Sequence, residues 1–247
     1  MPCITLYKND CLDQLPKIQT ETIDLILTDL PYGTTYAPWD SVLPLEKLWS
    51  EWLRCLTPKG AIVLTASQPF TSQLVMSKPE LFRCEWIWDK VNGANFANAN
   101  RQPLKVHESV LVFGKRQTTY NPQKTIGKPN HTQGSFAKSR NCETQLISKR
   151  VEDNLSGLKY PKSIQTFPKH SSQSKLHPTQ KPVELFEYLI RTYSNERDIV
   201  LDCCAGSGTT GEAAFRSNRH AILIENDPAY IEIIKMRLKE MNVRTES

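Results

Sequence analysis

The sequence predicts an α/β fold built on a doubly wound, mostly parallel, seven-stranded sheet with an antiparallel edge. Three observations support this prediction. Short apolar runs alternate with segments of helical periodicity, the connections between them are short, and two neighbouring runs near the middle of the chain have no helix between them. With 247 residues, 39% of them hydrophobic, the chain can form one large domain with a packed core.

Seven apolar runs bounded by turn residues are predicted to be strands. In chain order they are residues 4–7, 23–27, 61–66, 85–90, 107–113, 199–202 and 221–225. Five of these runs alternate with helices, as in a parallel sheet. The runs 85–90 and 107–113 are joined only by a polar loop, and we expect them to pair as an antiparallel hairpin.

The segments between the strands show helical spacing of apolar residues. Helices are predicted around residues 12–18, 45–56, 69–77, 183–193, in a stretch ending near 215, and from 228 to 241. We expect Pro58-Lys59-Gly60 to stop the second helix. Asp227 should cap the last helix, with Pro228 in its first turn.

The charge is distributed unevenly. Residues 115–181 carry 13 Lys and Arg but only 3 Asp and Glu, a net charge of +10, whereas the rest of the chain carries −5. A basic segment on a mildly acidic body indicates a polyanionic partner, for which nucleic acid is the natural candidate. The alternative is a solvated insertion whose lysines only keep it soluble.

The basic segment also interrupts the regular pattern. Residues 115–176 lack a sustained apolar period, so we expect an insertion that is partly ordered and that completes its folding on binding. The predicted organisation is a first half at 1–114, the insertion at 115–176 and a second half at 177–247.

Seven scattered cysteines show neither a CxxC pair nor zinc spacing, so we expect reduced thiols and no metal. Cys203 and Cys204 are adjacent, but without a further ligand at metal spacing they are interpreted as small buried residues. No apolar run is long enough to span a bilayer, and residues 1–8 lack a signal-peptide layout. The protein is therefore expected in the cytoplasm.

A glycine-rich stretch points to a nucleotide cofactor. Residues 206–211 fit GxGxxG between a strand and a helix, and Glu225 ends the next strand. Glycines let a ligand approach the backbone, and the acidic side chain can accept ribose hydroxyl groups. An NAD-dependent dehydrogenase is one candidate, but the 36 residues after Gly211 are too few for a second mononucleotide-binding half. An adenosine cofactor fits better.

Three separated motifs resemble those of one family. Thr28-Asp29-Leu30-Pro31-Tyr32-Gly33 is similar to an Asp-Pro-Pro-Tyr catalytic motif, and residues 201–210, LDCCAGSGTT, are similar to an Leu-Asp-Pro-Phe-x-Gly-Ser-Gly-Thr-Thr cofactor motif. Residues 177–182, HPTQKP, match the segment that precedes it. These motifs resemble the amino-group DNA methyltransferases that use S-adenosylmethionine. The order, with the catalytic motif first, is that of the family's β group, and the fold implied is a Rossmann-like methyltransferase sheet with an inserted target-recognition region.

The resemblance implies a catalytic role for Asp29, Leu30, Pro31 and Tyr32. Amino groups on bases are poor nucleophiles because their lone pair is delocalised. In the family the Asp carboxylate and the next backbone carbonyl accept the two amino hydrogens, while Tyr stacks on a base flipped out of the duplex. Leu30 replaces the usual proline, but the mechanism needs only its carbonyl, held extended by Pro31.

The resemblance also implies the residues that bind S-adenosylmethionine. They are Asp10, Asp29, Thr179, Lys181, Asp202, Cys204, Ala205, Gly206, Ser207, Gly208, Thr209, Thr210, Glu225 and Asn226. Glu225 is expected at the ribose, Asp10 at the adenine amine, and Thr179 and Lys181 at the methionine carboxylate. Asp10 has the alternative of capping a helix, and Lys181 that of being a surface charge. Because Cys203-Cys204 replaces Pro-Phe, we expect weaker cofactor affinity without loss of activity.

The function expected from the resemblance is transfer of a methyl group to the N6 amino group of adenine in double-stranded DNA, since the family's cytosine enzymes more often begin the catalytic motif with Ser. The alternatives are an N4-cytosine enzyme, a methyltransferase for protein or RNA, and a non-catalytic DNA-binding protein on the same fold. Trp39 and Phe96, in loops near the site, are candidates to stack on DNA. Homodimers are common in the group, and any restriction nuclease is expected to be a separate protein.

Overall fold

The computed structural model describes residues 2–33, 40–128, 157–169, 180–241 and 245–246. The chain divides into two compact units. The first comprises Met1–Asn121 and Ser163–Ser247, and the second comprises Pro122–Lys162. The first unit contains all three motifs of the sequence, apart from the undescribed residues 177–179 of the HPTQKP segment.

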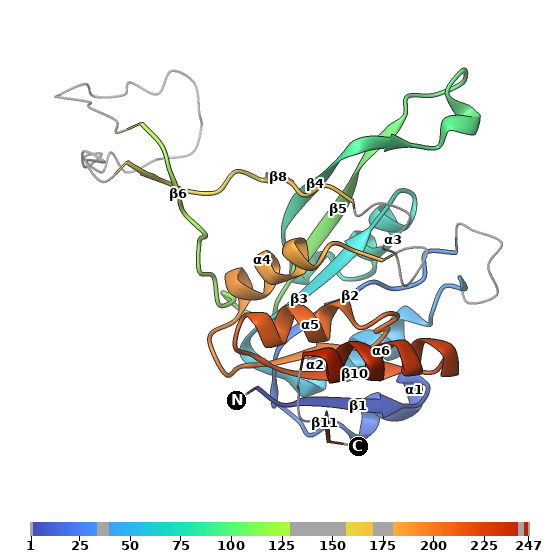
Figure 1. The fold of residues 1–247 in the computed structure, drawn as a ribbon, viewed down its shortest axis with the longest axis vertical. Coiled ribbons are helices and arrows are strands. Elements are labelled where there is room, and N and C mark those ends of the chain that lie inside the picture. Colours follow the sequence, from blue (N-terminus) through green and yellow to red (C-terminus); the bar gives the residue numbers. More distant parts are fainter. Residues whose placement is uncertain (1, 34–39, 129–156, 170–179, 242–244, 247) are drawn as a thin grey trace. The chain divides into compact units, whose positions relative to one another are not determined.

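The described part of the first unit is built on a nine-stranded sheet with the order β11-β1-β10-β9-β2-β3-β5-β4-β8 (Figure 1). Seven strands correspond to the predicted runs: β1 Ile4–Lys8, β2 Ile23–Thr28, β3 Leu56–Ala66, β4 Phe82–Ala94, β5 Lys105–Phe113, β9 Ile199–Asp202 and β10 His220–Glu225. The short strands β8, Ile164–Thr166, and β11, Thr245–Glu246, extend the two edges and were not predicted. The predicted α/β fold class is confirmed.

Strand directions follow the prediction as well. From β11 through β3, every neighbouring pair is parallel. Strand β5 is antiparallel to both β3 and β4, so the expected hairpin is present. The hairpin is longer than the sequence suggested, and its far end extends beyond the rest of the sheet (Figure 1).

The helices lie close to their predicted positions: α1 Cys11–Gln14, α2 Leu45–Cys55, α3 Phe70–Ser77, α4 Val183–Tyr193, α5 Thr209–Arg216 and α6 Pro228–Glu240. The short 3-10 helices are η1 Leu15–Lys17, η2 Pro79–Leu81 and η3 Phe96–Asn98. Asp227 caps α6 by accepting a hydrogen bond from the Ala229 amide, as predicted.

The expected stop at Pro58-Lys59-Gly60 is wrong. Helix α2 ends at Cys55 and strand β3 begins at Leu56, so these three residues lie inside the strand. Leu56 is fully buried and pairs with Ile23 of β2, which draws the chain into the sheet before the proline is reached.

Two apolar clusters lie against the sheet. One joins sheet residues to apolar side chains of α4, α5 and α6, and the other joins them to α1, α2 and α3. Neighbouring residues of β2 divide between them, because Leu25 and Leu27 belong to the first cluster and Ile26 to the second. Trp86 and Trp88 are both buried in the first cluster, which confirms that they face one side of β4 and pack in the core.

The second unit is small in its described part. Strands β6, Thr125–Ile126, and β7, Leu158–Lys159, pair antiparallel. The Lys124 ammonium lies 4.4 Å from the centre of the Tyr160 ring. Within the described ranges of the whole chain, we find no helix with the length and apolar character needed to cross a bilayer.

Candidate active site

A cavity of about 460 Å³ lies at the carboxyl ends of β1, β2, β9 and β10. In open α/β sheets, ligands bind in such a crevice outside the carboxyl ends of the strands. Fifteen of the predicted site residues lie in its wall: Asp10, Asp29, Leu30, Pro31, Tyr32, Lys181, Asp202, Cys204, Ala205, Gly206, Ser207, Thr209, Thr210, Glu225 and Asn226. Gly208 does not line the cavity. Thr179 and Trp39 lie outside the described residues.

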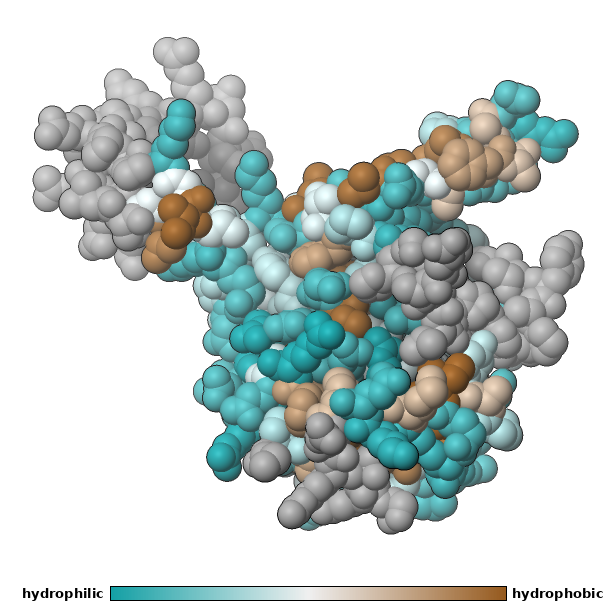
Figure 2. All heavy atoms as spheres, viewed as in Figure 1, coloured by the Kyte–Doolittle hydropathy of each residue, from teal (hydrophilic) through white to brown (hydrophobic). Residues whose placement is uncertain are grey.

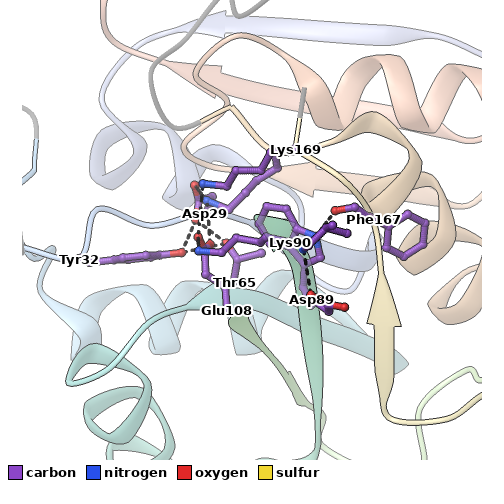
Figure 3. A network of polar contacts seen from close by, with 11 residues as sticks. Asp29, Tyr32, Thr65, Asp89, Lys90, Glu108, Phe167 and Lys169 are labelled. Carbon is purple, nitrogen blue, oxygen red and sulfur yellow. Dashed lines mark hydrogen bonds and ion pairs between the residues drawn. The ribbon is translucent and has the colours of Figure 1, made fainter. Parts of the chain in front are cut away.

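Asp29 follows the last residue of β2 and is held by three donors (Figure 3). One carboxylate oxygen accepts hydrogen bonds from the Tyr32 hydroxyl, at 2.7 Å, and from the Thr65 hydroxyl. The other oxygen lies 2.5 Å from the Lys181 ammonium. These contacts fix the orientation of the carboxylate at the edge of the cavity.

Lys181 is a buried cation, with only 6% of its surface exposed, so it is not a surface charge. Its ammonium contacts Asp29 and also lies 3.6 Å from Glu108 of β5. Burial opposes the charge, but the two carboxylates outweigh it and raise the Lys181 pKa above its usual value. The side chain therefore stays protonated.

Glu108 is the centre of a second set of contacts. The ammonium groups of Lys90, Lys181 and Lys169 lie 3.2, 3.6 and 3.9 Å from its carboxylate oxygens. Burial favours the neutral acid, but these three cations lower the Glu108 pKa below its usual value. A chain of alternating charges thus runs from Asp29 through Lys181 to Glu108 and Lys90, the last three of which are largely buried.

Tyr32 presents its ring to the same region. The ring stacks on Phe70 of α3, with centroids 5.4 Å apart and planes inclined by 27°. Burial and the carboxylates of Asp29 and Glu108 raise the pKa of Tyr32 well above its usual value. The hydroxyl is therefore a neutral donor that holds Asp29, and the ring is fixed from behind by Phe70.

Asp202, at the end of β9, ties the two sequence motifs together. Its carboxylate accepts a 2.7 Å hydrogen bond from the hydroxyl of Thr28, the residue before Asp29, and another from the Thr210 hydroxyl. It also accepts the Cys204 amide at 3.1 Å. Burial is the main cause that raises the Asp202 pKa to about 6. One buried carboxylate thereby joins chain segments 174 residues apart.

Glu225, at the end of β10, organises the glycine-rich loop. One of its oxygens accepts the Gly206 amide at 2.7 Å, and the other accepts the amides of Asn226 and Asp227 at 3.0 and 2.9 Å. Burial raises the Glu225 pKa. The loop itself needs glycine at Gly208, whose φ of +78° is left-handed and where a Cβ would lie 3.0 Å from Ile234.

Asp10 combines the two roles considered for it. Its side chain caps α1 by accepting the Leu12 amide at 2.8 Å, and it also lines the cavity. Leu30 does more than offer a carbonyl, because its side chain is 3% exposed and packs in the core. Cys203 is buried as expected, whereas Cys204 is only half-buried and faces the cavity.

Sequence reasoning missed several residues of the wall, among them Cys11, Asp40, Glu108, Lys169, Phe186 and Tyr230. Glu108 lies in an apolar strand run, where a single charged residue is a usable signal of a buried site. Cys11 directly follows Asp10 but gave no pattern of its own, because its partners lie near the other end of the chain.

Comparison with known proteins gives the family. The model described as DNA methylase, for enzymes of the N6 and N4 amino type, matches residues 23–236. The type II methyltransferase M1.MboII of Moraxella bovis is 26% identical over 96% of this chain and 97% of its own length. The DNA adenine methyltransferase YhdJ of Escherichia coli is 29% identical over 97% of this chain and 83% of its own length.

Solved structures share the fold. The M1.HpyAVI complex with S-adenosylmethionine has a TM-score of 0.62 at 24% identity, covering 95% of this chain and 100% of that one. The PvuII DNA methyltransferase, described as cytosine-N4-specific, has a TM-score of 0.65 at 17% identity, covering 99% and 96%. Similar proteins thus include enzymes named for adenine and for cytosine.

Proposed function

Since the chain belongs to the N6/N4 amino-group DNA methyltransferase family and is an S-adenosylmethionine-dependent DNA methyltransferase, we propose that its acceptor is the N6 amino group of adenine. The observation that carries this proposal is the carboxylate of Asp29, at the first position of the catalytic motif and at the edge of the cavity. The family's cytosine enzymes more often have Ser there. An N4-cytosine enzyme is the second candidate, supported by the fold shared with the cytosine-N4-specific PvuII enzyme.

The proposed chemistry relies on hydrogen-bond acceptors held in advance. Asp29 and the Leu30 carbonyl accept the two amino hydrogens, which frees the nitrogen lone pair to attack. The bound cofactor supplies the sulfonium methyl group. Lys181 keeps Asp29 oriented through their 2.5 Å contact, a positioning role that differs from the expected contact with the methionine carboxylate.

The target base must leave the duplex to reach this site. We assign Tyr32 to stack on the flipped base, because its ring is fixed by Phe70 at 5.4 Å and its hydroxyl is anchored on Asp29. A ring that is already immobile loses little entropy when a base stacks on it.

For the cofactor we propose that Asp202 and the loop 205–210 surround the methionine end, that Glu225 and Asn226 hold the ribose, and that Asp10 meets the adenine amine. The lining of the cavity supports this assignment. Glu225 supports it further, since backbone amides hold each of its oxygens and one oxygen still has lone-pair capacity for a ribose hydroxyl.

We propose that double-stranded DNA contacts the insertion 115–176 and the end of the β4–β5 hairpin, with 1–114 and 177–247 as the catalytic and cofactor-binding halves. Phe96 at this end is 68% exposed. Exposed apolar residues Val91, Leu104 and Val106 lie on the same hairpin, and Figure 2 shows apolar colour along it. Arg101 and Lys105 supply positive charge beside them.

A product analysis tests the acceptor. The protein is incubated with duplex DNA of mixed sequence and S-adenosylmethionine labelled on the methyl group, and the digested bases are separated. We expect labelled N6-methyladenine, lost in Asp29→Ala by at least about a hundredfold because the main acceptor of the amino hydrogens is gone. The exposed carboxylate variant Glu80→Ala should match the wild type.

Two results would change the proposal. N4-methylcytosine as the sole product would replace adenine by cytosine. Undiminished methyl transfer by Asp29→Ala would remove the assigned mechanism, and an absence of transfer by the wild-type protein on every DNA tested would favour a non-catalytic DNA-binding protein.

A further inference from the structure

Three thiols meet in the wall of the cofactor cavity. Cys11 is the first residue of α1, whereas Cys203 and Cys204 directly follow β9. All three line the same cavity, although nearly the whole chain separates Cys11 from the other two. Nothing in the proposed methyl transfer uses them.

The three thiols are in contact and are not equivalent. The thiols of Cys203 and Cys204 both hydrogen-bond to Cys11, and these two bonds are the largest causes that lower the Cys11 pKa, against the effect of burial. The same contacts raise the pKa of Cys203 and of Cys204. Cys11 is therefore the thiol that carries the negative charge, and a thiolate is the reactive form of cysteine.

The other described cysteines provide a contrast. Cys55 is fully buried, and burial raises its pKa to about 11, so it stays protonated. Cys84 is exposed on β4, and its sulfur lies 3.7 Å from the Tyr193 hydroxyl. Neither lines the cavity.

A metal site does not account for the cluster. Among the residues that the structure describes, no group of three or more His, Cys, Asp or Glu side chains is arranged to hold an ion. Cys203 is 2% exposed, and its thiol donates to the Thr28 hydroxyl at 3.6 Å. Cys204 is half-buried, which makes it the more accessible neighbour of Cys11.

We propose that Cys11 and Cys204 form an oxidisable thiol pair in the cofactor cavity, with hydrogen peroxide as the oxidant. The Cys11 thiolate attacks one peroxide oxygen, the O–O bond breaks, and hydroxide leaves, so Cys11 becomes a sulfenic acid. The Cys204 thiol then attacks the Cys11 sulfur, an S–S bond forms, the S–O bond breaks, and water leaves. The proton of Cys204 neutralises the released hydroxide. Two thiols are oxidised to one disulfide and one peroxide is reduced to two waters.

The crosslink changes the cavity. It ties the start of α1 to the residue that precedes Ala205 and Gly206, while the Cys204 amide is bonded to Asp202. Sulfurs that now face the cavity are drawn together across its wall. Oxidation therefore blocks the cofactor, and a bound cofactor in turn shields the thiols. This inference rests on the proposed placement of the cofactor in this cavity.

Peptide mapping tests the pair directly. The full-length protein is treated with hydrogen peroxide, free thiols are alkylated, and a non-reducing digest is examined by mass spectrometry. We expect a peptide containing Cys11 linked to the one containing Cys204, lost after dithiothreitol and suppressed by saturating S-adenosylhomocysteine. In parallel, calorimetry should show that the oxidised protein loses S-adenosylhomocysteine binding and regains it after reduction.

Variants identify the partners. Cys203→Ser should keep the crosslink and Cys204→Ser should lose it, with a sulfenic acid at Cys11 trapped by dimedone instead. Cys84→Ser is the matched control and should keep both the crosslink and the basal methyl transfer. A crosslink that persists in Cys204→Ser, or peroxide-treated folded protein without any crosslink to Cys11, would overturn the proposal. A crosslink that forms without affecting S-adenosylhomocysteine binding would keep the thiol pair but reject the cofactor placement, since the mapping requires no methyl transfer.

Discussion

At the scale of single residues, the site depends on charges that neutralise one another. Asp29 lies among two hydroxyl donors and one ammonium, and the same ammonium contacts Glu108. Removing one member of a buried ion pair leaves the other uncompensated, which is commonly more costly than removing both. Lys181 is therefore the residue on which both carboxylates depend.

Lys181→Met tests this dependence. We expect methyl transfer to fall by about a hundredfold, because a misplaced catalytic group loses its alignment, with Lys181→Arg less affected. The Glu108 pKa, held below its usual value in part by Lys181, should rise in Lys181→Met. Glu108 contributes stability above its unfolded pKa of 4.5, and that contribution is lost as the pH falls through its lower folded pKa. The difference in unfolding free energy between wild type and variant should thus be larger at neutral pH than near about pH 3. A difference independent of pH would contradict the role given to this cation.

Asp202 gives a pH effect of the opposite sign. Its folded pKa is raised to about 6 from 3.8, so the folded protein binds a proton more readily than the unfolded chain between these values, and stability falls as the pH rises through them. Keeping this carboxylate charged at neutral pH costs about 3 kcal/mol. Relative to wild type, Asp202→Asn should gain stability at about pH 7 compared with about pH 4, as measured by denaturant unfolding. The exposed control Asp13→Asn should show no such trend, and an equal difference at both pH values for Asp202→Asn would rule out the buried charge as the cause.

Single-residue roles were the hardest part to predict from the sequence. The motifs named Asp29, Tyr32, Asp202 and Glu225, and the structure brings them to one cavity. Glu108, Phe70 and Cys11 were not found, because their importance comes from neighbours that only the folded sheet provides. The packing of Leu30 was missed for the same reason.

At the scale of elements, the sequence predicted the strands and helices of the sheet well, because each has a clear apolar period and a turn signal. The errors lie where tertiary contacts override local signals. Leu56 draws β3 toward β2 before the proline, and the short strands β8 and β11 exist only because an edge is available to pair with.

The β4–β5 hairpin yields a prediction of its own. Phe96 lies in η3 at the end of the hairpin and is 68% exposed. Stacking of a base on an aromatic ring contributes about 1–3 kcal/mol, so Phe96→Ala should weaken the dissociation constant for duplex DNA about tenfold or more, with an unchanged melting temperature. Fluorescence anisotropy measures the affinity. Met76→Ala, at another exposed apolar side chain, is the control. Equal affinities of Phe96→Ala and wild type would exclude the hairpin end as a stacking surface.

At the scale of the whole molecule, the basic insertion is the part that the sequence describes least. Its charge was evident from composition, but of residues 115–176 the structure describes only 115–128 and 157–169. Composition predicts a partner class, since phosphate neutralisation depends on charge alone, whereas the target sequence depends on base contacts that composition does not encode.

Salt dependence tests the insertion. Lys128 and Lys162 are exposed, and the double variant Lys128→Gln, Lys162→Gln should bind duplex DNA more weakly, with a slope of log affinity against log salt flattened by about 0.9 per lost phosphate contact. The matched double variant Lys47→Gln, Lys239→Gln, at exposed positions on α2 and α6, should keep the wild-type slope. Identical slopes for the two double variants would show that the insertion does not contact phosphates.

The order of strands in the sheet also constrains how the protein is made. Strand β1 pairs with β10, so Ile4 must wait for Ala221 to be synthesised before its ladder can form, and β9 and β10 both separate β1 from β2. A ribosome thus releases the first strand long before its partner exists, and the edges of β1 and β2 stay unpaired meanwhile. Asp29 meets Lys181 and Thr28 meets Asp202 only when translation is nearly complete. Prematurely terminated chains consequently lack this assembled site, and DNA is modified only by chains whose synthesis has passed the last strands of the sheet.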